Sequence, residues 1–478
     1  MTTEIKAFIR DFVKDLLENN VAIFAGAGMS KPQGYVNWAE LLSEIVHDLG
    51  LEIDREYDLV SIAQYHVNEK SRAKLTKKIL EEFNEDTEIS ESHRILARLP
   101  ISTYWTTNYD KLIEDAFDEA NKIVDVKSQV EQIFDTRPKR DAVLYKMHGD
   151  ATVPSKTILT KEEYEAYYLT HEPFISALRG DLTTKTFLFI GFSFTDPNLD
   201  YVLSRIKVNY GKPKDHYCFI RKPKLGEKGS EIQADFEYST RKQILMIGEL
   251  KRYGIQPLLI DEYPEIEEIL REIENRFRKK TVFISGSAEE YGKWTRLEAQ
   301  EFIHKLSKKI VISNFRIVNG FGWGVGSGVI NGALEAVYEQ PKKFSEQQLI
   351  MKPFPQFNTG EKNLKELWEE YRQRMIKLAG IAIFIFGNKL DADGKVIPAN
   401  GVQREFEIAV ENGLIPIPVG ITGYVAKNVF DEISKDFDSY YKGYEWIIPI
   451  VKDIAANDKL TADQIIGKIV EIISKVNK

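Results

Sequence analysis

The sequence predicts an α/β protein with parallel sheets, divided into two domains. Its 478 residues exceed the roughly 100–200 residues of a typical domain, so more than one domain is expected. Short apolar runs alternate along the chain with stretches of helical periodicity, as strands and helices do in α/β folds. Each half also contains a glycine-rich turn between a predicted strand and a predicted helix.

The composition excludes several broad classes of protein. Hydrophobic residues make up 43% of the chain, which is enough for full cores, and the formal net charge of −8 argues against a general nucleic-acid binder. The most apolar runs, 186–194 and 381–386, are far shorter than the roughly 18 residues that span a bilayer. A single cysteine, Cys218, allows neither an internal disulfide nor a zinc site of several thiolates. We therefore expect a cytoplasmic protein without a bound metal.

A domain boundary is expected near Lys279. The segment 265–277 repeats apolar residues with helical spacing, and a short basic stretch follows it. A new apolar strand then begins at Thr281. The expected domains are residues 1–279 and 280–478. Three long polar segments are expected to be loops: 221–233, 340–363 and 391–402.

In the first domain, four predicted strands end in small and polar residues. They are 21–25 before Gly26-Ala27-Gly28-Met29-Ser30, 102–107 before Asn108-Tyr109-Asp110, 142–147 before His148-Gly149-Asp150, and 186–190 before Gly191-Phe192-Ser193-Phe194-Thr195-Asp196-Pro197-Asn198. Open parallel sheets bind ligands at the carboxyl ends of their strands. Four such clusters predict one ligand site at that edge of the sheet.

Each cluster also has a simpler interpretation. The turn that begins at Gly26 could serve packing alone. Asn108 and Asp110 could cap the helix that follows them, and Asp196 could belong to a turn and helix cap. An isolated histidine such as His148 is more often a hydrogen-bonded core residue than a catalytic group.

Together and in this order, four segments resemble the sirtuin family. They are the turn 26–30, Thr-Asn-Tyr-Asp at 107–110, Lys-Met-His-Gly-Asp at 146–150, and Gly-Phe-Ser at 191–193. The resemblance covers most of residues 10–260. It implies a Rossmann-like domain that binds NAD and cleaves the bond between nicotinamide and ribose.

The chain departs from protein-deacylating sirtuins in two respects. Those enzymes hold zinc on four cysteines, whereas this chain has only Cys218. They also carry a Gly-Ile-Pro-Asp-Phe-Arg stretch, and the matching segment 33–38 here reads Gln-Gly-Tyr-Val-Asn-Trp. Both departures argue against a peptide substrate and leave NAD cleavage as the expected reaction.

Cleavage develops positive charge on the ribose anomeric carbon, as in glycoside hydrolysis. Asn108 is expected to hydrogen-bond a ribose hydroxyl or the attacking water, and His148 to accept a proton. Asp110 is expected to orient a partner or stabilise the cation. NAD binding is assigned to eight residues, of which the glycine turn holds phosphates and the last two face the adenosine side: Gly26, Ala27, Gly28, Met29, Ser30, Gly191, Ser193 and Asp196.

The second domain carries another candidate nucleotide site. A predicted strand at 281–284 ends in Ser285-Gly286-Ser287, and a second at 315–318 runs into the loop 319–328. Five of the ten residues in that loop are glycine, among them Gly320, Gly322 and Gly324. This high density of glycines would allow the backbone to approach a phosphate closely, although a purely structural loop is the alternative.

Three charged residues are candidates for the same site. Arg372 and Lys389 flank the predicted strand 381–386 and suit phosphates, whereas Glu405, on a predicted helix, suits ribose hydroxyls. Each of them taken singly could be an ordinary surface charge.

The Ser-Gly-Ser turn and the glycine-rich loop resemble the SLOG family, which senses nucleotide-derived ligands. A sirtuin-like half followed by a SLOG-like half resembles the NAD-cleaving effectors of bacterial Thoeris antiphage systems. That resemblance implies that a TIR-domain partner, ThsB, makes a cyclic ADP-ribose isomer, which binds the SLOG pocket at Arg372, Lys389 and Glu405 and activates NAD hydrolysis. It also implies a homo-oligomer, either a tetramer or a larger assembly.

Two other functions remain open at this point. An NAD-dependent protein deacylase would use the same NAD site and an acyl-lysine peptide, against which the missing cysteines argue. A non-catalytic nucleotide-binding module would bind NAD without turnover, and it would not need both Asn108 and His148.

Overall fold

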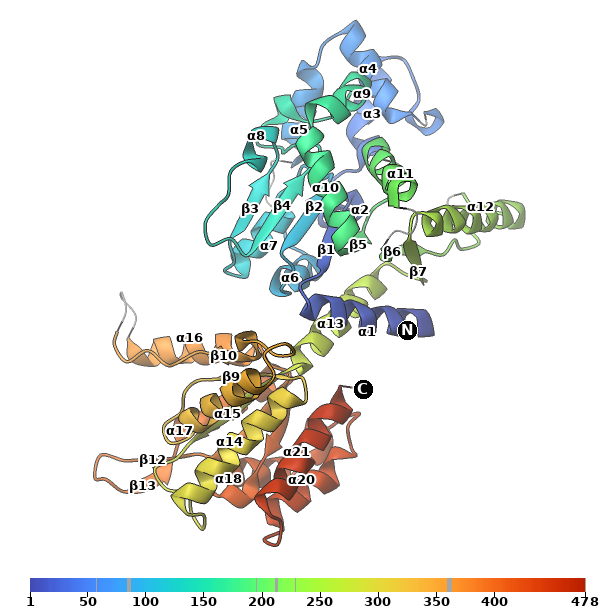
Figure 1. Ribbon diagram of the computed structural model, residues 1–478. Helices are drawn as coiled ribbons and strands as arrows, with labels where there is room; N and C mark the ends of the chain where they lie inside the picture. The colour runs from blue at the N-terminus through green and yellow to red at the C-terminus, as the bar shows by residue number, and fades with distance from the viewer. Residues whose placement is uncertain are drawn as a thin grey trace. The chain divides into compact units, whose positions relative to one another are not determined.

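The structure, a computed structural model, describes residues 1–56, 58–83, 87–194, 196–210, 214–227, 229–358 and 363–477. It forms two compact units, Met1–Glu274 and Asn275–Lys478 (Figure 1). Thr195 of the fourth predicted cluster lies outside the described residues. None of the helices within the described ranges is long and apolar enough to cross a membrane.

The first unit contains a parallel sheet with the strand order β3-β4-β2-β1-β5-β6-β7. Its strands are β1 Val21–Ala25, β2 Thr103–Thr106, β3 Val124–Lys127, β4 Ala142–Lys146, β5 Thr186–Ile190, β6 His216–Arg221 and β7 Ile255–Ile260. β1 lies between β2 and β5, so that Ile23 pairs with Tyr104 on one side and with Leu188 on the other. The loops after β1, β2, β4 and β5 therefore meet at one edge of the sheet, as the sequence predicts.

Helices of the first unit cover both faces of this sheet (Figure 1). They are α1 Thr3–Leu17, α2 Ala27–Ser30, α3 Trp38–Asp48, α4 Leu59–Glu69, α5 Ala73–Phe83, α6 Glu91–Arg98, α7 Leu112–Glu119, α8 Val130–Ile133, α9 Lys161–Thr170, α10 Glu172–Thr184, α11 Pro197–Tyr210 and α12 Gln233–Arg252. A further helix, α13 Pro264–Lys279, begins in the first unit and ends in the second. Capping boxes begin α3, through Asn37 and Glu40, and α9, through Thr160 and Glu163. Phe24, Trp105 and Phe189 are buried in the core beneath.

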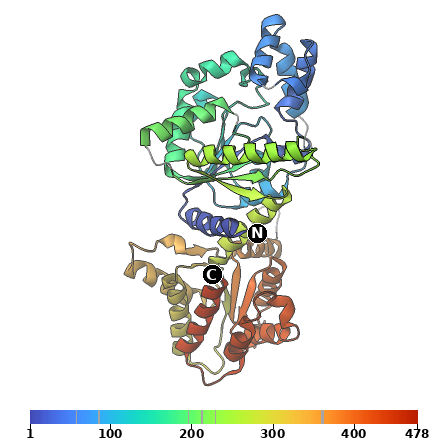
Figure 2. The same cartoon turned by 90° about the vertical axis from the view of Figure 1, so that its right-hand side faces the viewer.

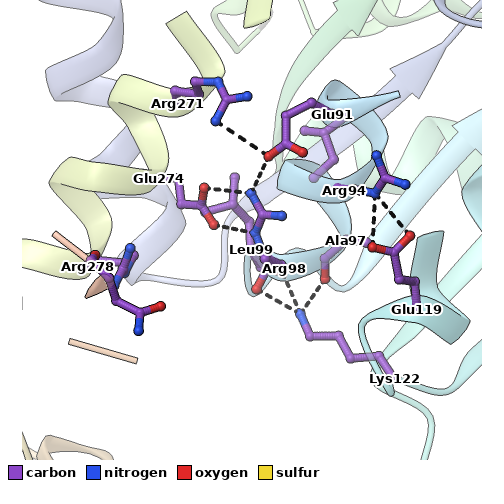
Figure 3. A network of polar contacts seen from close by, with 12 residues as sticks. Glu91, Arg94, Ala97, Arg98, Leu99, Glu119, Lys122, Arg271, Glu274 and Arg278 are labelled. Atoms are coloured by element: carbon purple, nitrogen blue, oxygen red, sulfur yellow. Dashed lines mark hydrogen bonds and ion pairs between the residues drawn. The ribbon is translucent and has the colours of Figure 1, made fainter. Parts of the chain in front are cut away.

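Ion pairs fasten α13 to α6 within the first unit (Figure 3). Arg98 Nε and Nη2 donate to the two carboxylate oxygens of Glu274 at 2.7 and 2.9 Å, and Nη2 also lies 2.9 Å from Glu91. These carboxylates raise the pKa of Arg98 further above its ordinary value. Lys122 donates to the last carbonyls of α6, those of Ala97, Arg98 and Leu99. The two parallel bonds between Arg98 and Glu274 fix the orientation of α13 on α6.

The second unit contains a five-stranded parallel sheet with the order β10-β9-β8-β11-β14 and a separate antiparallel pair, β12 and β13. The strands are β8 Thr281–Ser287, β9 Arg316–Asn319, β10 Leu349–Met351, β11 Ile381–Phe386, β12 Asn388–Leu390, β13 Val396–Pro398 and β14 Ile415–Pro418. Its helices are α14 Arg296–Ile312, α15 Gly326–Glu339, α16 Leu364–Ile376, α17 Asn400–Glu411, α18 Tyr424–Ile433, α19 Phe437–Tyr440, α20 Ile447–Ala456 and α21 Ala462–Val476. β11 is buried along its whole length, as its apolar sequence predicts.

The prediction that 340–363 and 391–402 are loops was wrong in part. β10 lies in the first segment and pairs with β9, while β13 lies in the second and pairs with β12. Each of these strands has three residues, so neither shows a periodic apolar pattern. Their strand conformation depends on neighbours that sequence periodicity cannot reveal.

Candidate functional site

The glycine turn after β1 packs directly against the loop after β5. A Cβ atom on Gly26 would lie 2.5 Å from the carbonyl oxygen of Gly191, and a Cβ on Gly191, whose φ is +64°, would lie 2.2 Å from the nitrogen of Met29. The N–H groups of Gly26 and Gly28 donate to the carbonyls of Ile190 and Gly191, both at 2.9 Å. The glycines therefore permit close contact of two loops, and these two donors are already used within the protein.

Asn108, at the end of β2, reaches across to the glycine turn. Its side-chain Nδ2 donates to the carbonyl of Gly26 at 3.1 Å and to Oγ of Ser30 at 3.0 Å. Its main-chain N–H donates to Oγ1 of Thr106 at 3.0 Å. The structure thus brings Asn108 together with Gly26 and Ser30, which the sequence placed at the end of another strand.

A pocket opens beside Asn108. Four predicted site residues line it: Ala27, Ser30, Asn108 and Asp110. Sequence analysis missed the aromatic part of its wall, which consists of Tyr35, Trp38, Phe83 and Tyr109. The first two lie at or beside the segment 33–38, and the signal that could have found them was its departure from the deacylase pattern.

Asp110 lies between β2 and α7, and its two carboxylate oxygens have different surroundings. One carboxylate oxygen, Oδ1, accepts a hydrogen bond from the N–H of Leu112 at 3.1 Å at the start of α7. The other, Oδ2, is buried and has no hydrogen-bond partner among the described residues, although the side chain lines the pocket. Since a buried unpaired carboxylate oxygen is costly, Oδ2 is poised to meet a ligand group.

His148, at the end of β4, lies against Asp196 and Tyr164. The imidazole is 1% exposed, and its Nε2 lies 3.2 Å from Oδ2 of Asp196. The hydroxyl of Tyr164 lies 3.4 Å from Nδ1, and the Tyr164 ring packs at 6.2 Å from the ring of Trp38 in the pocket wall. His148 is not among the residues that line the pocket, and Tyr164 lies between the imidazole and Trp38 of the pocket wall. No motif pointed to Tyr164.

Asp196 begins α11 and also faces the histidine. Its Oδ1 accepts from the N–H groups of Asn198 and Leu199 at 2.9 and 3.0 Å, as a helix cap does. Burial alone would raise the pKa of Asp196, but His148 and these two N–H groups lower it below the ordinary value. Asp196 is thus an ionised partner of His148, a contact that the expected adenosine-side role did not include.

The other predicted NAD-binding residues differ in exposure. Met29 is buried and lines a small apolar cavity with His93 and Tyr104, so its side chain belongs to the core. Ser193 is exposed two residues after Gly191.

In the second unit, three predicted residues from β8, α16 and α17 form one cluster. Ser285 Oγ donates to Oε2 of Glu405 at 2.5 Å, and Arg372 Nε lies 3.8 Å from Oε1. The guanidinium of Arg372 lies over the ring of Phe354, 5.1 Å from its centre, and sequence analysis missed this phenylalanine. Burial raises the pKa of Glu405 although Ser285 and Arg372 oppose the shift.

Glycines of the second unit also bring loops into contact. A Cβ on Gly322 would lie 2.0 Å from the carbonyl oxygen of Gly286, and a Cβ on Gly320 would lie 2.7 Å from the Phe354 ring. Gly324 has a φ of +69°, and its Cβ would meet the carbonyl oxygen of Ala288. These contacts hold the glycine-rich loop beside the Arg372–Glu405 cluster, because Phe354 touches both.

Two predicted residues of this site make other contacts. Ser287 Oγ donates to the carbonyl of Asn388 at 2.9 Å. Lys389 is on β12 and donates to Asn400, at the start of α17, at 2.6 Å. Neither bonds the Ser285–Glu405–Arg372 cluster in the part of the chain that the structure describes.

Two further observations concern metals and the thiol. Within the described ranges, no group of three or more His, Cys, Asp or Glu side chains could hold a metal ion. Cys218 is buried, and burial raises the pKa of its thiol to about 12.

Comparison with known proteins gives two family matches and several relatives. Residues 102–258 match the SIR2-like domain, and residues 265–476 match the Sir2- and TIR-associating SLOG family. NAD(+) hydrolase ThsA of Bacillus cereus (strain MSX-D12) is 48% identical over 99% of this chain and 98% of its own length. NAD(+) hydrolase ThsA of Cytobacillus dafuensis is 44% identical over 99% and 97%, and that of Acinetobacter baumannii 46% over 92% of each.

The chain belongs to the ThsA family. This membership confirms the predicted order of a sirtuin-like domain and a SLOG domain, and the two parallel sheets confirm the α/β fold. Since the ThsA relatives match almost end to end, the resemblance holds for both units and not for one domain alone.

Proposed function

We propose that this chain hydrolyses NAD to ADP-ribose and nicotinamide in antiphage defence, at the pocket beside Asn108. The observation that supports this most strongly is the meeting of Asn108, Ser30 and the Gly26 carbonyl at a pocket that Asp110 also lines. The relatives named NAD(+) hydrolase ThsA agree with it.

In the proposed reaction, water adds to the anomeric carbon of the ribose as nicotinamide leaves, and one proton is released. Asn108 holds the water or a ribose hydroxyl, and it stays neutral at every working pH. His148, paired with the ionised Asp196, takes up the proton. The unpaired Oδ2 of Asp110 offers negative charge to the cationic ribose.

Protein deacylation is the less favoured alternative. Cys218 is the sole cysteine, so the zinc module of deacylating sirtuins has no counterpart in this sequence. Tyr35 and Trp38 also close part of the pocket wall in the segment where the deacylase pattern is missing.

We also propose that residues 280–478 sense a cyclic ADP-ribose isomer made by the TIR-domain partner ThsB, and that residues 1–279 respond by cleaving NAD. The buried cluster of Ser285, Glu405 and Arg372 offers a hydroxyl, a carboxylate and a cation beside a glycine-rich loop, which suits ribose and phosphate groups. A signal activates only if it binds the active state more tightly than the inactive state.

A homo-oligomer, a tetramer or a larger assembly, is part of the same proposal. The helix α12 has 20 residues, and Leu250 is the buried residue among them. Figure 2 shows this helix on the outside of the first unit. Tyr238, Ile244 and Leu245 are 71%, 53% and 60% exposed along this helix. Exposed large apolar side chains on one helix favour contact with another protein surface. A cytoplasmic location agrees with the buried, unpaired Cys218.

The proposed reaction is tested by product analysis. Purified chain is incubated with NAD and the cyclic isomer, without any peptide, and nicotinamide and ADP-ribose are quantified. Equal amounts of both products support hydrolysis. Turnover that requires an acyl-lysine peptide would support the deacylase, and NAD binding without any product would support the non-catalytic module.

A further inference from the structure

Lys146 is a fully buried lysine on β4, two residues before His148. Its side chain is 0% exposed, although an ammonium group is among the costliest groups to bury. The proposed reaction gives it no role, and it is not among the residues that line the pocket beside Asn108. Its surroundings explain both why it is tolerated there and what it does.

Four acceptors surround the ammonium group. It donates to the main-chain carbonyls of Asp110 at 2.6 Å and Tyr109 at 3.3 Å, and to Oε1 of Glu114 at 2.9 Å. It also pairs with the carboxylate of Asp150. Burial alone would lower the pKa of Lys146, but the carboxylates around it raise the pKa above the ordinary value. The group is therefore held as a cation.

These acceptors belong to the two loops that carry the proposed catalytic residues. Tyr109 and Asp110 directly follow Asn108, and the two carbonyls have no other cationic partner among the described residues. Asp150 lies two residues after His148, and its Oδ1 accepts from the N–H of Thr152 at 2.8 Å. A single ammonium thus joins the loop after β2 to the loop after β4.

The same loops are joined once more without Lys146. The N–H of Ala151 donates to the carbonyl of Tyr109 at 3.1 Å. Because of this second bond, the loops would stay together without the ammonium group. Loss of the ammonium group would still remove the strongest hydrogen bonds that hold the main chain next to Asn108. Displacement of a positioned group by about 1 Å can cost roughly a hundredfold in rate.

We propose that Lys146 is a positioning residue for NAD cleavage. It acts through the main chain beside Asn108 and through the turn after His148, and it does not touch NAD. The inference rests on the proposed NAD hydrolysis. A purely structural role is the competing explanation, and it predicts that activity follows stability in every variant.

Three variants separate these explanations. Lys146→Met keeps the length of the side chain and removes the charge and the donors, which leaves Glu114 and Asp150 without their cation. Lys146→Met with Glu114→Gln removes one of those uncompensated carboxylates but restores none of the bonds to Tyr109 and Asp110. Glu114→Gln alone is the matched control, because it keeps Lys146 and its main-chain bonds.

The measurements are the thermal unfolding midpoint, and kcat and KM for NAD with the activating cyclic isomer present. We expect Lys146→Met to lower both the midpoint and kcat, kcat by about a hundredfold, with KM changed less than about threefold. In the double variant, we expect the unfolding midpoint to recover partly and kcat to stay as low as in Lys146→Met. Glu114→Gln should keep kcat within about threefold of the unaltered chain.

Recovery of kcat together with the midpoint in the double variant would overturn the proposal, and so would an unchanged kcat in Lys146→Met. If neither methionine variant folds, Lys146→Arg decides the question, because it keeps the charge but moves the donors. Positioning predicts a kcat at least tenfold lower there, and a kcat within twofold contradicts it. Absence of turnover by the unaltered chain would instead reject the proposed function.

Discussion

Nε2 of His148 lies 3.2 Å from Oδ2 of Asp196, although the two residues follow different strands, β4 and β5. Oδ1 of the same aspartate caps α11 through the N–H groups of Asn198 and Leu199. One carboxylate therefore fixes the start of a helix and holds a charge beside the histidine. In the Ser-His-Asp triad an aspartate orients the imidazole through Nδ1, whereas here the aspartate faces Nε2.

Replacing Asp196 with asparagine should slow the chemistry while preserving the fold. Asparagine can still cap α11 through its oxygen, but it offers no negative charge to a protonated His148. We expect kcat for NAD to fall about a hundredfold, the scale of a positioned acid–base group, with a smaller change in KM. Nicotinamide release measures this directly. Asp200→Asn on the same helix is the control, and an equal loss in both variants would argue against the His148 contact.

Gly191→Ala should disrupt the contact between the loops after β1 and β5. The residue has a φ of +64°, and an added Cβ would lie 2.2 Å from the nitrogen of Met29. We expect a loss of stability of about 1–3 kcal/mol and loss of NAD binding, because Asn108 is bonded to the displaced turn. Gly248→Ala, on the open surface of α12, should instead stabilise by roughly 0.5–1 kcal/mol. Calorimetry and NAD titration distinguish the two.

Arg372→Ala should abolish the response to the cyclic isomer. Its guanidinium lies beside Glu405 and over Phe354, where the proposed signal phosphates would pair with it. The pocket beside Asn108 is untouched, so any basal NAD turnover should remain. Arg374→Ala is the matched control, since Arg374 is on the same helix with a side chain that is 67% exposed. Activation that survives in Arg372→Ala would contradict the signal-site assignment.

Glu405→Gln should raise the unfolding temperature in a pH-dependent manner. Burial raises the pKa of Glu405 in the folded state, so ionisation of this carboxyl opposes folding. Below the unfolded pKa of about 4.3 the variant and the unaltered chain should unfold alike, and their difference should grow as the pH rises. About 1 kcal/mol would shift the midpoint by roughly 2–4 °C. If the stability of Glu405→Gln relative to the unaltered chain fell between pH 4 and pH 7, the predicted sign of the effect would be wrong.

Much of the candidate site follows from one rule about parallel sheets. Because strand ends gather at one edge, the clusters at Gly26, Asn108, His148 and Gly191 could be expected to converge, and the loops after β1, β2, β4 and β5 do meet there. The Ser285–Glu405 contact is not covered by this rule, because Glu405 lies inside the helix α17.

Other features depend on packing that no local pattern encodes. Tyr164 and Phe354 lie on no motif, and each belongs to a site because a helix or loop carries it there. The N–H groups of Gly26 and Gly28 resemble free phosphate donors in sequence, yet the loop after β5 accepts both. Lys146 belongs to the Lys-Met-His-Gly-Asp segment, but only the fold shows that its ammonium group is surrounded by acceptors from two loops.

In the proposed mechanism, signal binding to the second unit switches on NAD cleavage in the first. The most direct measurement is nicotinamide release as a function of the concentration of the cyclic ADP-ribose isomer, for the unaltered chain and for Asn108→Ala. We predict release that rises to saturation in the unaltered chain and is at least about a hundredfold lower in folded Asn108→Ala. Nicotinamide release that does not change with the isomer concentration, or that is equal in the two proteins, would contradict the proposed mechanism.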